Sequence, residues 1–505
     1  MNDNLSILGE IEQNSIQTII TQIENSYKSL PPLLKIYSKC KDLLKEQGTL
    51  WIFTNNIINN SKLIPIPFIL CNNLKELGYV LKNLIVYYNL NYKNNSVNFE
   101  NRYSHIIFLT KQKDNYKFNK DPIREKHIWK NVEWSGGRKS RYNEKGKDPS
   151  NFWLKTKDNG KGKIIEYLIL KKSEAIDRII KATTSKDDKI LFLHDKFNKI
   201  NNFNENFLSV ELKFNFLEQK DELNLVKSID YKNHALLIKN HLKSNIFIKS
   251  SENMNDLPDN TIQSVITSPP YWGLRDYDHS NQIGYNSPYI EYLNRLNKVW
   301  KECYRVLKNN GTLWININKR VKEGNMILFP YNFYTTIEKI GFSLLDIIIW
   351  HKPIAVSAYG EKNLGDRYEF ILLFSKTSDY KFNKEIKLLH TPDYIHLNNE
   401  DLPNIWRMFR KIGNIGREVS LMIKNKKIRH TAIYPKELVR RIILLSTNKG
   451  DYILDPFAGS GTTLVVANKL FRNWIGYEIN PNYVEIMKYR LKAEGKKVMK
   501  LDEFL

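Results

Sequence analysis

Cysteines, acidic residues and long apolar runs are all scarce in this chain. The three cysteines, Cys40, Cys71 and Cys303, are too few for a disulfide framework and lack the spacing of zinc ligands. No stretch approaches the roughly 18 apolar residues of a membrane-spanning helix, and the N-terminus has no basic region followed by an apolar core. We therefore expect a reduced, cytoplasmic protein that neither enters a membrane nor binds a metal.

Acidic residues are outnumbered, since 54 Asp and Glu stand against 78 Lys and Arg and leave a formal net charge of +24. An excess of this size favours a polyanionic partner, and nucleic acid first. The alternative is a solvated basic surface that only reflects a composition rich in Lys, Asn and Ile. Charge therefore points to a partner without deciding the fold.

The chain of 505 residues is long enough for two or three domains, and its halves resemble each other. CKDLLKEQGTLWIF starts at Cys40 and CYRVLKNNGTLWIN at Cys303, a separation of 263 residues (303 − 40). Further matches have separations of 263 or, at the second pair, 265 (367 − 102): Gly78 with Gly341, Arg102 with Arg367, and Thr184 with Thr447. Several matches in the same order indicate an internal duplication.

The two copies differ at two short segments, TSPPYWGLRDY from Thr267 and DPFAGSGTT from Asp455, which only copy two carries. Just before the first segment the separation is 246 (267 − 21), so copy one has lost about 17 residues there (263 − 246). At the second segment Phe192 stands where Asp455 stands, and no glycine-rich turn follows. We therefore predict that copy one keeps the scaffold and lacks the site.

Copy two alternates short apolar runs with amphipathic segments. The runs suit buried strands and are SVIT (264–267), TLWININ (312–318), LLDIIIW (344–350), FILLFS (370–375), DYILD (451–455) and NWIGYE (473–478). Amphipathic helices are predicted over 289–307 and 435–447. The alternation predicts an α/β fold with a Rossmann-like, mainly parallel sheet covered by helices, and the repeat predicts a second such sheet in copy one.

YILDPFAGSGTT has the features of a nucleotide-binding turn. A strand ends in Asp455, a Gly-x-Gly turn follows, and a helix begins at once. Asp455 can accept a hydrogen bond from a cationic amino group, while Gly459 and Gly461 remove the Cβ atoms that would block a nucleoside. One strand later, Glu478 is placed to bind ribose hydroxyls.

DPFAGSGTT resembles the S-adenosylmethionine motif of the amino-group DNA methyltransferases, which modify adenine N6 or cytosine N4, and TSPPYW resembles their catalytic motif. The catalytic motif comes first, as in the β-group enzymes. The resemblance covers about residues 241–491, and residues 15–200 only through the repeat. It implies a duplicated S-adenosyl-L-methionine-dependent methyltransferase sheet that acts on double-stranded DNA. It further implies catalytic roles for Ser268, Pro269, Pro270 and Tyr271, and cofactor binding by Asp455, Pro456, Phe457, Gly459, Gly461, Thr462 and Glu478.

The TSPPY segment suits the activation of an exocyclic base amine, which is a poor nucleophile because its lone pair is delocalised into the ring. Ser268 Oγ and the Pro269 carbonyl can accept the two amine hydrogen bonds, and the prolines fix the direction of that carbonyl. A target inside the duplex must be flipped out, and Tyr271 offers a ring on which it can stack. Trp272 is compatible with either base contact or core packing.

One expected contact is missing, because β-group enzymes commonly carry a Gly-Asp pair before the catalytic strand, with its acid on the cofactor adenine. Lys249, Ser250 and Ser251 stand there in this chain. Asp256 or backbone groups would then have to contact the adenine.

Three functions are compatible with these motifs. A serine at the head of the catalytic motif favours cytosine N4 over adenine N6 methylation, in a restriction-modification or epigenetic system that can include a cognate endonuclease. The third function is a catalytically silent DNA-binding regulator. Cytosine C5 methylation is disfavoured, because that chemistry needs a thiolate, usually in a Pro-Cys pair, and no proline precedes any of the three cysteines.

The repeat also predicts how the chain is divided. Residues 1–200 form the non-catalytic copy, whose basic segment 111–163, with Trp153 among its aromatic residues, either contacts DNA or is a solvated loop. Residues 201–240 are a linker, and residues 241–505 are the catalytic domain. Target recognition is expected near 352–430, through basic residues mixed with Trp406 and Phe409. The copies together would form an internal pseudo-dimer within a monomer.

Overall fold

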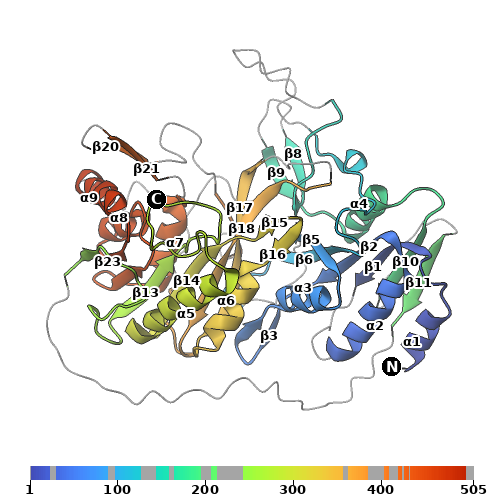
Figure 1. Ribbon diagram of the computed structural model, residues 1–505, viewed down its shortest axis with the longest axis horizontal. Helices are drawn as coiled ribbons and strands as arrows, with labels where there is room; N and C mark the ends of the chain where they lie inside the picture. The colour runs from blue at the N-terminus through green and yellow to red at the C-terminus, as the bar shows by residue number, and fades with distance from the viewer. Residues whose placement is uncertain are drawn as a thin grey trace.

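Two β-sheets, one in each copy of the repeat, lie side by side in the molecule (Figure 1). The computed structural model describes residues 2–22, 30–88, 97–126, 144–158, 164–194, 206–212, 243–356, 362–384, 403–408, 419–423, 426–430 and 433–495. Among these residues, no helix combines the length and the apolar character needed to cross a bilayer.

The sheet of copy one has seven strands in the order β11-β10-β1-β2-β6-β5-β7. They are β1 (Ile16–Gln22), β2 (Leu44–Thr54), β5 (Val80–Tyr88), β6 (Tyr103–Thr110), β7 (Phe152–Trp153), β10 (Lys189–His194) and β11 (Phe207–Glu211). The helices are α1 (Asn2–Gly9), α2 (Leu30–Leu43), α3 (Ile66–Glu76) and α4 (Lys172–Thr183), with a 3-10 helix at Asp121–Ile123. Two hairpins complete this copy: β3 (Ile57–Asn59) with β4 (Lys62–Ile64), and β8 (Lys155–Asp158) with β9 (Ile164–Leu168).

The sheet of copy two has eight strands in the order β12-β23-β22-β13-β14-β18-β17-β19. They are β12 (Asn245–Phe247), β13 (Ile262–Thr267), β14 (Leu307–Ile317), β17 (Ser343–Val356), β18 (Asp366–Ser375), β19 (Ile405–Arg407), β22 (Tyr452–Asp455) and β23 (Asn473–Tyr477). The helices are α5 (Tyr289–Val306), α6 (Phe329–Glu338), α7 (Lys436–Ser446), α8 (Thr462–Lys469) and α9 (Pro481–Gly495). Two hairpins complete this copy: β15 (Arg320–Lys322) with β16 (Asn325–Ile327), and β20 (Val419–Ile423) with β21 (Lys426–His430).

The two strand orders correspond position by position. β13, β14, β18 and β17 occupy the places that β1, β2, β6 and β5 hold in copy one, and β22 and β23 those of β10 and β11. A side-chain contact also repeats, since Trp51 Nε1 donates to Thr49 Oγ1 at 3.1 Å and Trp314 Nε1 donates to Thr312 Oγ1 at 3.0 Å. The duplicated Rossmann-like sheet predicted from the sequence is therefore confirmed.

The sheet of copy two is mainly parallel, and β18 is the one described strand that runs against its neighbours. β12, β23, β22, β13 and β14 are parallel neighbours, whereas β18 runs antiparallel to both β14 and β17. β18 follows β17 in the chain and returns beside it, whereas the edge strand β19 pairs with β17 in parallel. Five of the seven neighbouring pairs are parallel, so the prediction of a mainly parallel sheet is confirmed, with β18 as the exception. On the parallel side, every residue of β13 is buried, as expected for a strand covered on both faces.

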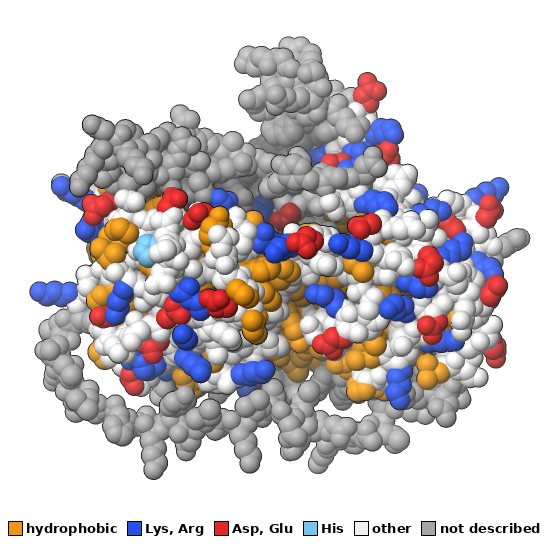
Figure 2. Space-filling view, in the orientation of Figure 1, with side chains coloured by type: hydrophobic (Ala, Val, Ile, Leu, Met, Phe, Trp, Pro, Cys, Tyr) orange, Lys and Arg blue, Asp and Glu red, His pale blue; other side chains and the backbone are white. Residues whose placement is uncertain are grey.

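The two copies pack against each other as the halves of a symmetric dimer do. The Tyr103 hydroxyl donates to the Ile347 carbonyl at 2.8 Å, and the Tyr368 hydroxyl donates to the Leu84 carbonyl. Tyr103 and Tyr368 are equivalent in the repeat, as are Leu84 and Ile347, so these contacts are reciprocal, as in a two-fold interface. Figure 2 shows hydrophobic side chains gathered between α3 and α6, where the copies meet.

The predicted boundaries need correction at the linker. β11 lies inside the predicted linker 201–240 but pairs in parallel with β10, so copy one continues past residue 200. The rest of that linker, 201–205 and 213–240, lies outside the described residues.

The two segments predicted to contact DNA are partly core. β18 lies inside 352–430 and is a buried strand, and Trp406 of β19 is fully buried beside Trp314, with ring centroids 6.4 Å apart. In the basic segment 111–163, Trp153 is fully buried near Trp51, at 6.2 Å between ring centroids. Trp153 and Trp406 lie in the edge strands β7 and β19, and their side chains are buried in the apolar core. Neither is therefore a DNA contact. Phe409 and residues 127–143 and 159–163 lie outside the described residues.

Candidate active site

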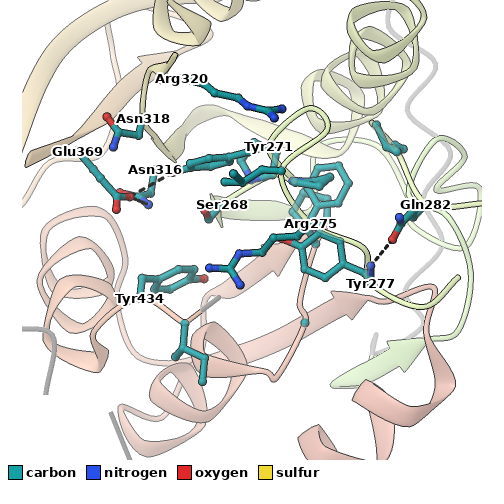
Figure 3. Close-up of a pocket in the computed structure, with 18 of the residues that line it drawn as sticks. Ser268, Tyr271, Arg275, Tyr277, Gln282, Asn316, Asn318, Arg320, Glu369 and Tyr434 are labelled. Atoms are coloured by element: carbon teal, nitrogen blue, oxygen red, sulfur yellow. Dashed lines mark hydrogen bonds between the residues drawn. The ribbon is translucent and has the colours of Figure 1, made fainter. Parts of the chain in front are cut away.

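A cavity of about 800 Å³ lies at the carboxyl ends of β13, β14, β22 and β23 and contains residues of both motifs (Figure 3). This edge is where ligands bind in open α/β sheets. All four predicted catalytic residues and most of the predicted cofactor residues border it: Ser268, Pro269, Pro270, Tyr271, Pro456, Phe457, Gly459, Thr462 and Glu478. Asp455 and Gly461, the other two predicted cofactor residues, do not border the cavity. The fold therefore brings two motifs that are far apart in the chain to one cavity.

The TSPPY loop is anchored at its fourth and fifth residues, Pro270 and Tyr271. The Pro270 carbonyl accepts the Tyr292 hydroxyl at 2.9 Å, and the Tyr271 hydroxyl donates to Glu369 Oε2 at 3.1 Å. Ser268 is half-buried at the end of β13, and none of the described residues hydrogen-bonds its hydroxyl. A fixed loop thus presents a serine hydroxyl and a tyrosine ring to the cavity.

The wall beside Tyr271 holds a buried ion pair that sequence reasoning missed. Glu369 of β18 and Lys352 of β17 are 5% and 3% exposed, and Lys352 Nζ lies 3.1 Å from Glu369 Oε1. Asn316 Nδ2 donates to Glu369 Oε2 at 2.9 Å, and Asn316 Oδ1 is buried with no partner among the described residues. Charged residues within otherwise apolar strands were the available signal, because buried charge is costly unless it is paired or functional.

Asp455 anchors the cofactor loop from behind. Its Oδ1 accepts the Thr267 hydroxyl at 2.8 Å and the Phe457 N–H at 3.1 Å, and its Oδ2 accepts the Thr463 hydroxyl at 2.6 Å and the Tyr434 hydroxyl at 3.1 Å. Burial raises the pKa of Asp455 against these four hydrogen bonds, which favour the charged form. The carboxylate therefore ties the cofactor loop to the strand that carries TSPPY.

Glu478 borders the cavity and also shapes the glycine turn. Its carboxylate accepts the backbone N–H of Gly459 and of Asn480, each at 2.8 Å. Burial raises the pKa of Glu478 to about 7, although both hydrogen bonds favour the charged form. The side chain is held where a carboxylate binds ribose in doubly wound folds.

Gly461 serves a different purpose from the one predicted. It has a φ of +77°, a left-handed conformation that favours glycine, and a Cβ there would collide with Met487 of α9. The expectation that Gly461 makes room for a nucleoside is therefore corrected, since it makes room for helix packing.

The residues in place of the Gly-Asp pair do border the cavity. Lys249, Ser250 and Ser251 line it, and Ser251 Oγ is buried without a partner among the described residues. Asp256 pairs with Lys249 and accepts the Tyr477 hydroxyl at 3.2 Å, and it does not border the cavity. A buried free hydroxyl in this wall suits a ligand contact better than Asp256 does.

Trp272 is explained by packing. Its Nε1 donates to the Ser287 carbonyl at 2.8 Å, and its ring lies 5.0 Å from that of Tyr289. It does not border the cavity, so of the two uses compatible with the sequence the structure supports packing.

Comparison with known proteins gives the class of this protein. The model of the N6_N4_Mtase family, described as DNA methylase, matches residues 17–193 and 262–489. The chain therefore belongs to this family, and it is an S-adenosyl-L-methionine-dependent DNA methyltransferase of the amino-group type, as the two motifs predicted. The family match extends into copy one, which lacks both motifs.

Two relatives each match about half of this chain. The type II methyltransferase M.Cfr9I of Citrobacter freundii is 32% identical over 274 residues, which are 48% of this chain and 86% of that protein. The type II methyltransferase M.BglII of Bacillus subtilis is 30% identical over 277 residues, 51% of this chain and 71% of that protein. Among solved structures, the PvuII DNA methyltransferase (cytosine-N4-specific) is 21% identical, with a TM-score of 0.39, and the match covers 51% of this chain and 93% of that one.

Proposed function

We propose that the protein transfers a methyl group to the exocyclic amine of a flipped-out base in double-stranded DNA, and that this base is cytosine, methylated at N4. The observation that carries the proposal is the single cavity in which the free hydroxyl of Ser268 and the ring of Tyr271 lie near the cofactor loop. Adenine N6 is the alternative target.

The chemistry proposed for the loop follows from its donors and acceptors. Ser268 Oγ and the Pro269 carbonyl accept the two amine hydrogens, which localises the nitrogen lone pair, and the Tyr271 ring stacks on the base. S-adenosyl-L-methionine, when bound, supplies the electrophilic methyl group on its sulfonium sulfur. The loop then aligns the amine nitrogen for direct attack, a step governed by positioning.

The polar wall supports cytosine over adenine. Beyond the amine, the Watson-Crick edge of cytosine presents two acceptors, N3 and O2, whereas adenine presents N1 and then an apolar C–H. Lys352 has three N–H donors, of which the described contacts use two on Asp366 and Glu369. A wall with a spare buried donor fits the second acceptor of cytosine and would leave that donor unpaired against adenine.

Copy one is proposed to be a non-catalytic partner fused to the enzyme. Phe192 occupies the place of Asp455 and packs against Phe207, with ring centroids 6.1 Å apart, so an aromatic cluster replaces the anchor of the cofactor loop. We expect a monomer in solution that binds one cofactor per chain. The basic segment 111–163 would hold DNA through its phosphates, which predicts a steep salt dependence of affinity.

The relatives are named type II methyltransferases, and a restriction-modification system with a cognate endonuclease is the corresponding proposal for this chain. The test is transfer of tritium from labelled S-adenosyl-L-methionine to DNA by the wild type and by Ser268→Ala. We expect incorporation by the wild type and its loss in the variant. A wild-type protein that binds DNA without incorporating tritium would instead be a silent regulator.

A further inference from the structure

Copy one contributes Asn151 to the candidate active site of copy two. Asn151 is 1% exposed and borders the cavity that contains Ser268. Its Nδ2 donates to Asp366 Oδ1 at 2.9 Å, and its Oδ1 accepts the backbone N–H of Arg367 at 3.0 Å. One wall of the cavity is therefore held in place by the copy that has no site of its own.

A series of polar contacts, through the partly exposed Asp366 and the buried Lys352 and Glu369, connects Asn151 to the ring proposed to stack on the base. The Asp366 carboxylate lies 3.4 Å from Lys352 Nζ, which lies 3.1 Å from Glu369 Oε1. Glu369 Oε2 in turn accepts the Tyr271 hydroxyl at 3.1 Å. Figure 3 shows Glu369 and Tyr271 on the same side of the cavity, with Ser268 between them and Tyr434. The orientation of the Tyr271 ring thus depends on contacts that begin in copy one.

Asp366, the first carboxylate in this series of contacts, is charged. Burial alone would raise the pKa of Asp366, but the neighbouring ammonium groups of Lys319 and Lys352, with the hydrogen bond from Asn151, hold it well below its usual value. Lys319 Nζ lies 3.0 Å from Asp366 Oδ1, the same oxygen that Asn151 contacts. Loss of the Asn151 contact would therefore change how Asp366 shares its charge between two lysines.

Copy one provides an internal comparison, because it keeps the scaffold without the motifs. The charged residues Lys319, Asp366 and Glu369 have the neutral equivalents Asn56, Asn101 and Ser104, at separations of 263 (319 − 56) and 265 (366 − 101 and 369 − 104). All three neutral residues are buried. The scaffold therefore folds without these charges, which ties them to the site.

The interface contact itself is present in both copies. Asn404 of copy two, 2% exposed, donates from Nδ2 to Asn101 Oδ1 at 2.8 Å, and its Oδ1 accepts the backbone N–H of Arg102 at 3.0 Å. Asn404 therefore makes with copy one the same two contacts that Asn151 makes with copy two, except that the side-chain partner of Asn404 is the neutral Asn101. The two asparagines are matched as interface residues, and they differ in whether the contacted side chain is charged and connected to the site.

We infer that Asn151 is a positioning residue for methyl transfer: it fixes Asp366, and through Lys352 and Glu369 it fixes the ring of Tyr271. Copy one is then required for catalysis and not only for solubility or DNA affinity. This inference rests on the proposed function of the TSPPY loop.

The test compares Asn151→Ala with Asn404→Ala in the full-length chain. Each variant removes two interface hydrogen bonds of matched length and burial, so both should lose similar thermal stability. We expect kcat of Asn151→Ala to fall about tenfold or more below that of Asn404→Ala, with little change in S-adenosyl-L-methionine affinity, because a lost hydrogen bond to a charged group is worth about that factor. Asp366→Asn, which keeps the side-chain volume, should lower kcat in the same way.

Equal kcat values in the two alanine variants would overturn the inference, as would wild-type kcat in Asp366→Asn. A wild-type protein that transfers no methyl group would overturn the proposed function instead, so the two failures are distinguishable. If Asn151→Ala does not fold, Asn151→Ser compared with Asn404→Ser removes the same amide contacts with a smaller loss of volume, and equal kcat values in that pair would overturn the inference.

Discussion

Glu478 should make cofactor binding depend on pH near neutrality. Glu478 is 9% exposed, and burial raises the pKa of its carboxyl group from 4.5 to about 7. A difference of this size corresponds to about 3 kcal/mol between the two protonation states. Ribose hydroxyls donate to the ionised carboxylate, so cofactor binding must favour the charged form and weaken as Glu478 becomes protonated.

The sign of the effect differs between folding and binding. Because the folded-state pKa lies above the unfolded value, the folded protein binds the proton more tightly, and the contribution of Glu478 to stability falls as pH rises from about 4.5 to about 7. Cofactor affinity should instead rise as pH rises, because the ionised carboxylate is the form that binds the ribose hydroxyls. Between about pH 8 and about pH 6 the ionised fraction falls roughly tenfold, and affinity should fall with it.

The measurement is calorimetric titration with S-adenosyl-L-methionine at these two pH values, for the wild type and Glu478→Gln. The glutamine cannot accept both backbone N–H groups and does not ionise, so we expect weaker binding and a shallower pH dependence. The cofactor's own titration affects both proteins equally and cancels in the comparison. Identical pH slopes in the two proteins would refute the role assigned to Glu478.

Three further outcomes follow from the geometry. Ser268→Ala and Tyr271→Ala should each lower the methylation rate at least about tenfold while cofactor affinity, measured by calorimetry, stays near the wild-type value; a large loss of affinity with an unchanged rate would contradict this. Gly461→Ala forces a side chain into a left-handed conformation against Met487, so thermal unfolding should show a loss of about 1–2 kcal/mol or more, and unchanged stability would speak against the packing role. A fragment starting at residue 243 exposes the face that copy one covers, and we expect it to aggregate or to bind DNA weakly; a soluble fragment with the full-length rate and salt dependence would show that copy one is dispensable.

The sequence predicted the parts of the structure that depend on local patterns. The six strands predicted in copy two and its helices at 289–307 and 435–447 are all present, because buried strands and amphipathic helices have distinct periodicities. β14 begins five residues before the predicted 312 (312 − 307), β17 runs six residues past the predicted 350 (356 − 350), and the short strands β12 and β19 were not predicted. The motifs predicted the cavity because the carboxyl ends of parallel strands meet at one edge. The repeat predicted a second sheet in copy one, and the structure adds that its strand order corresponds.

What the sequence did not predict depends on contacts between distant residues. Glu369 and Lys352 lie in strands that read as apolar, and their pairing appears only when β17 and β18 are placed side by side. Trp406 stands among basic residues in the sequence, yet β19 pairs with β17 and buries it. Asp455 could be predicted at a strand end, but not the hydroxyl of Tyr434 that occupies one of its oxygens.

The central claim, methylation of cytosine N4 by copy two, is tested most directly by identifying the modified base. DNA methylated by the wild-type protein is digested to nucleosides and separated by mass spectrometry, with DNA treated by Ser268→Ala as the control. We predict N4-methyldeoxycytidine in the wild-type sample and its loss in the control. N6-methyldeoxyadenosine in its place would contradict the assignment of the base, and no methylated nucleoside at all would contradict the enzymatic function.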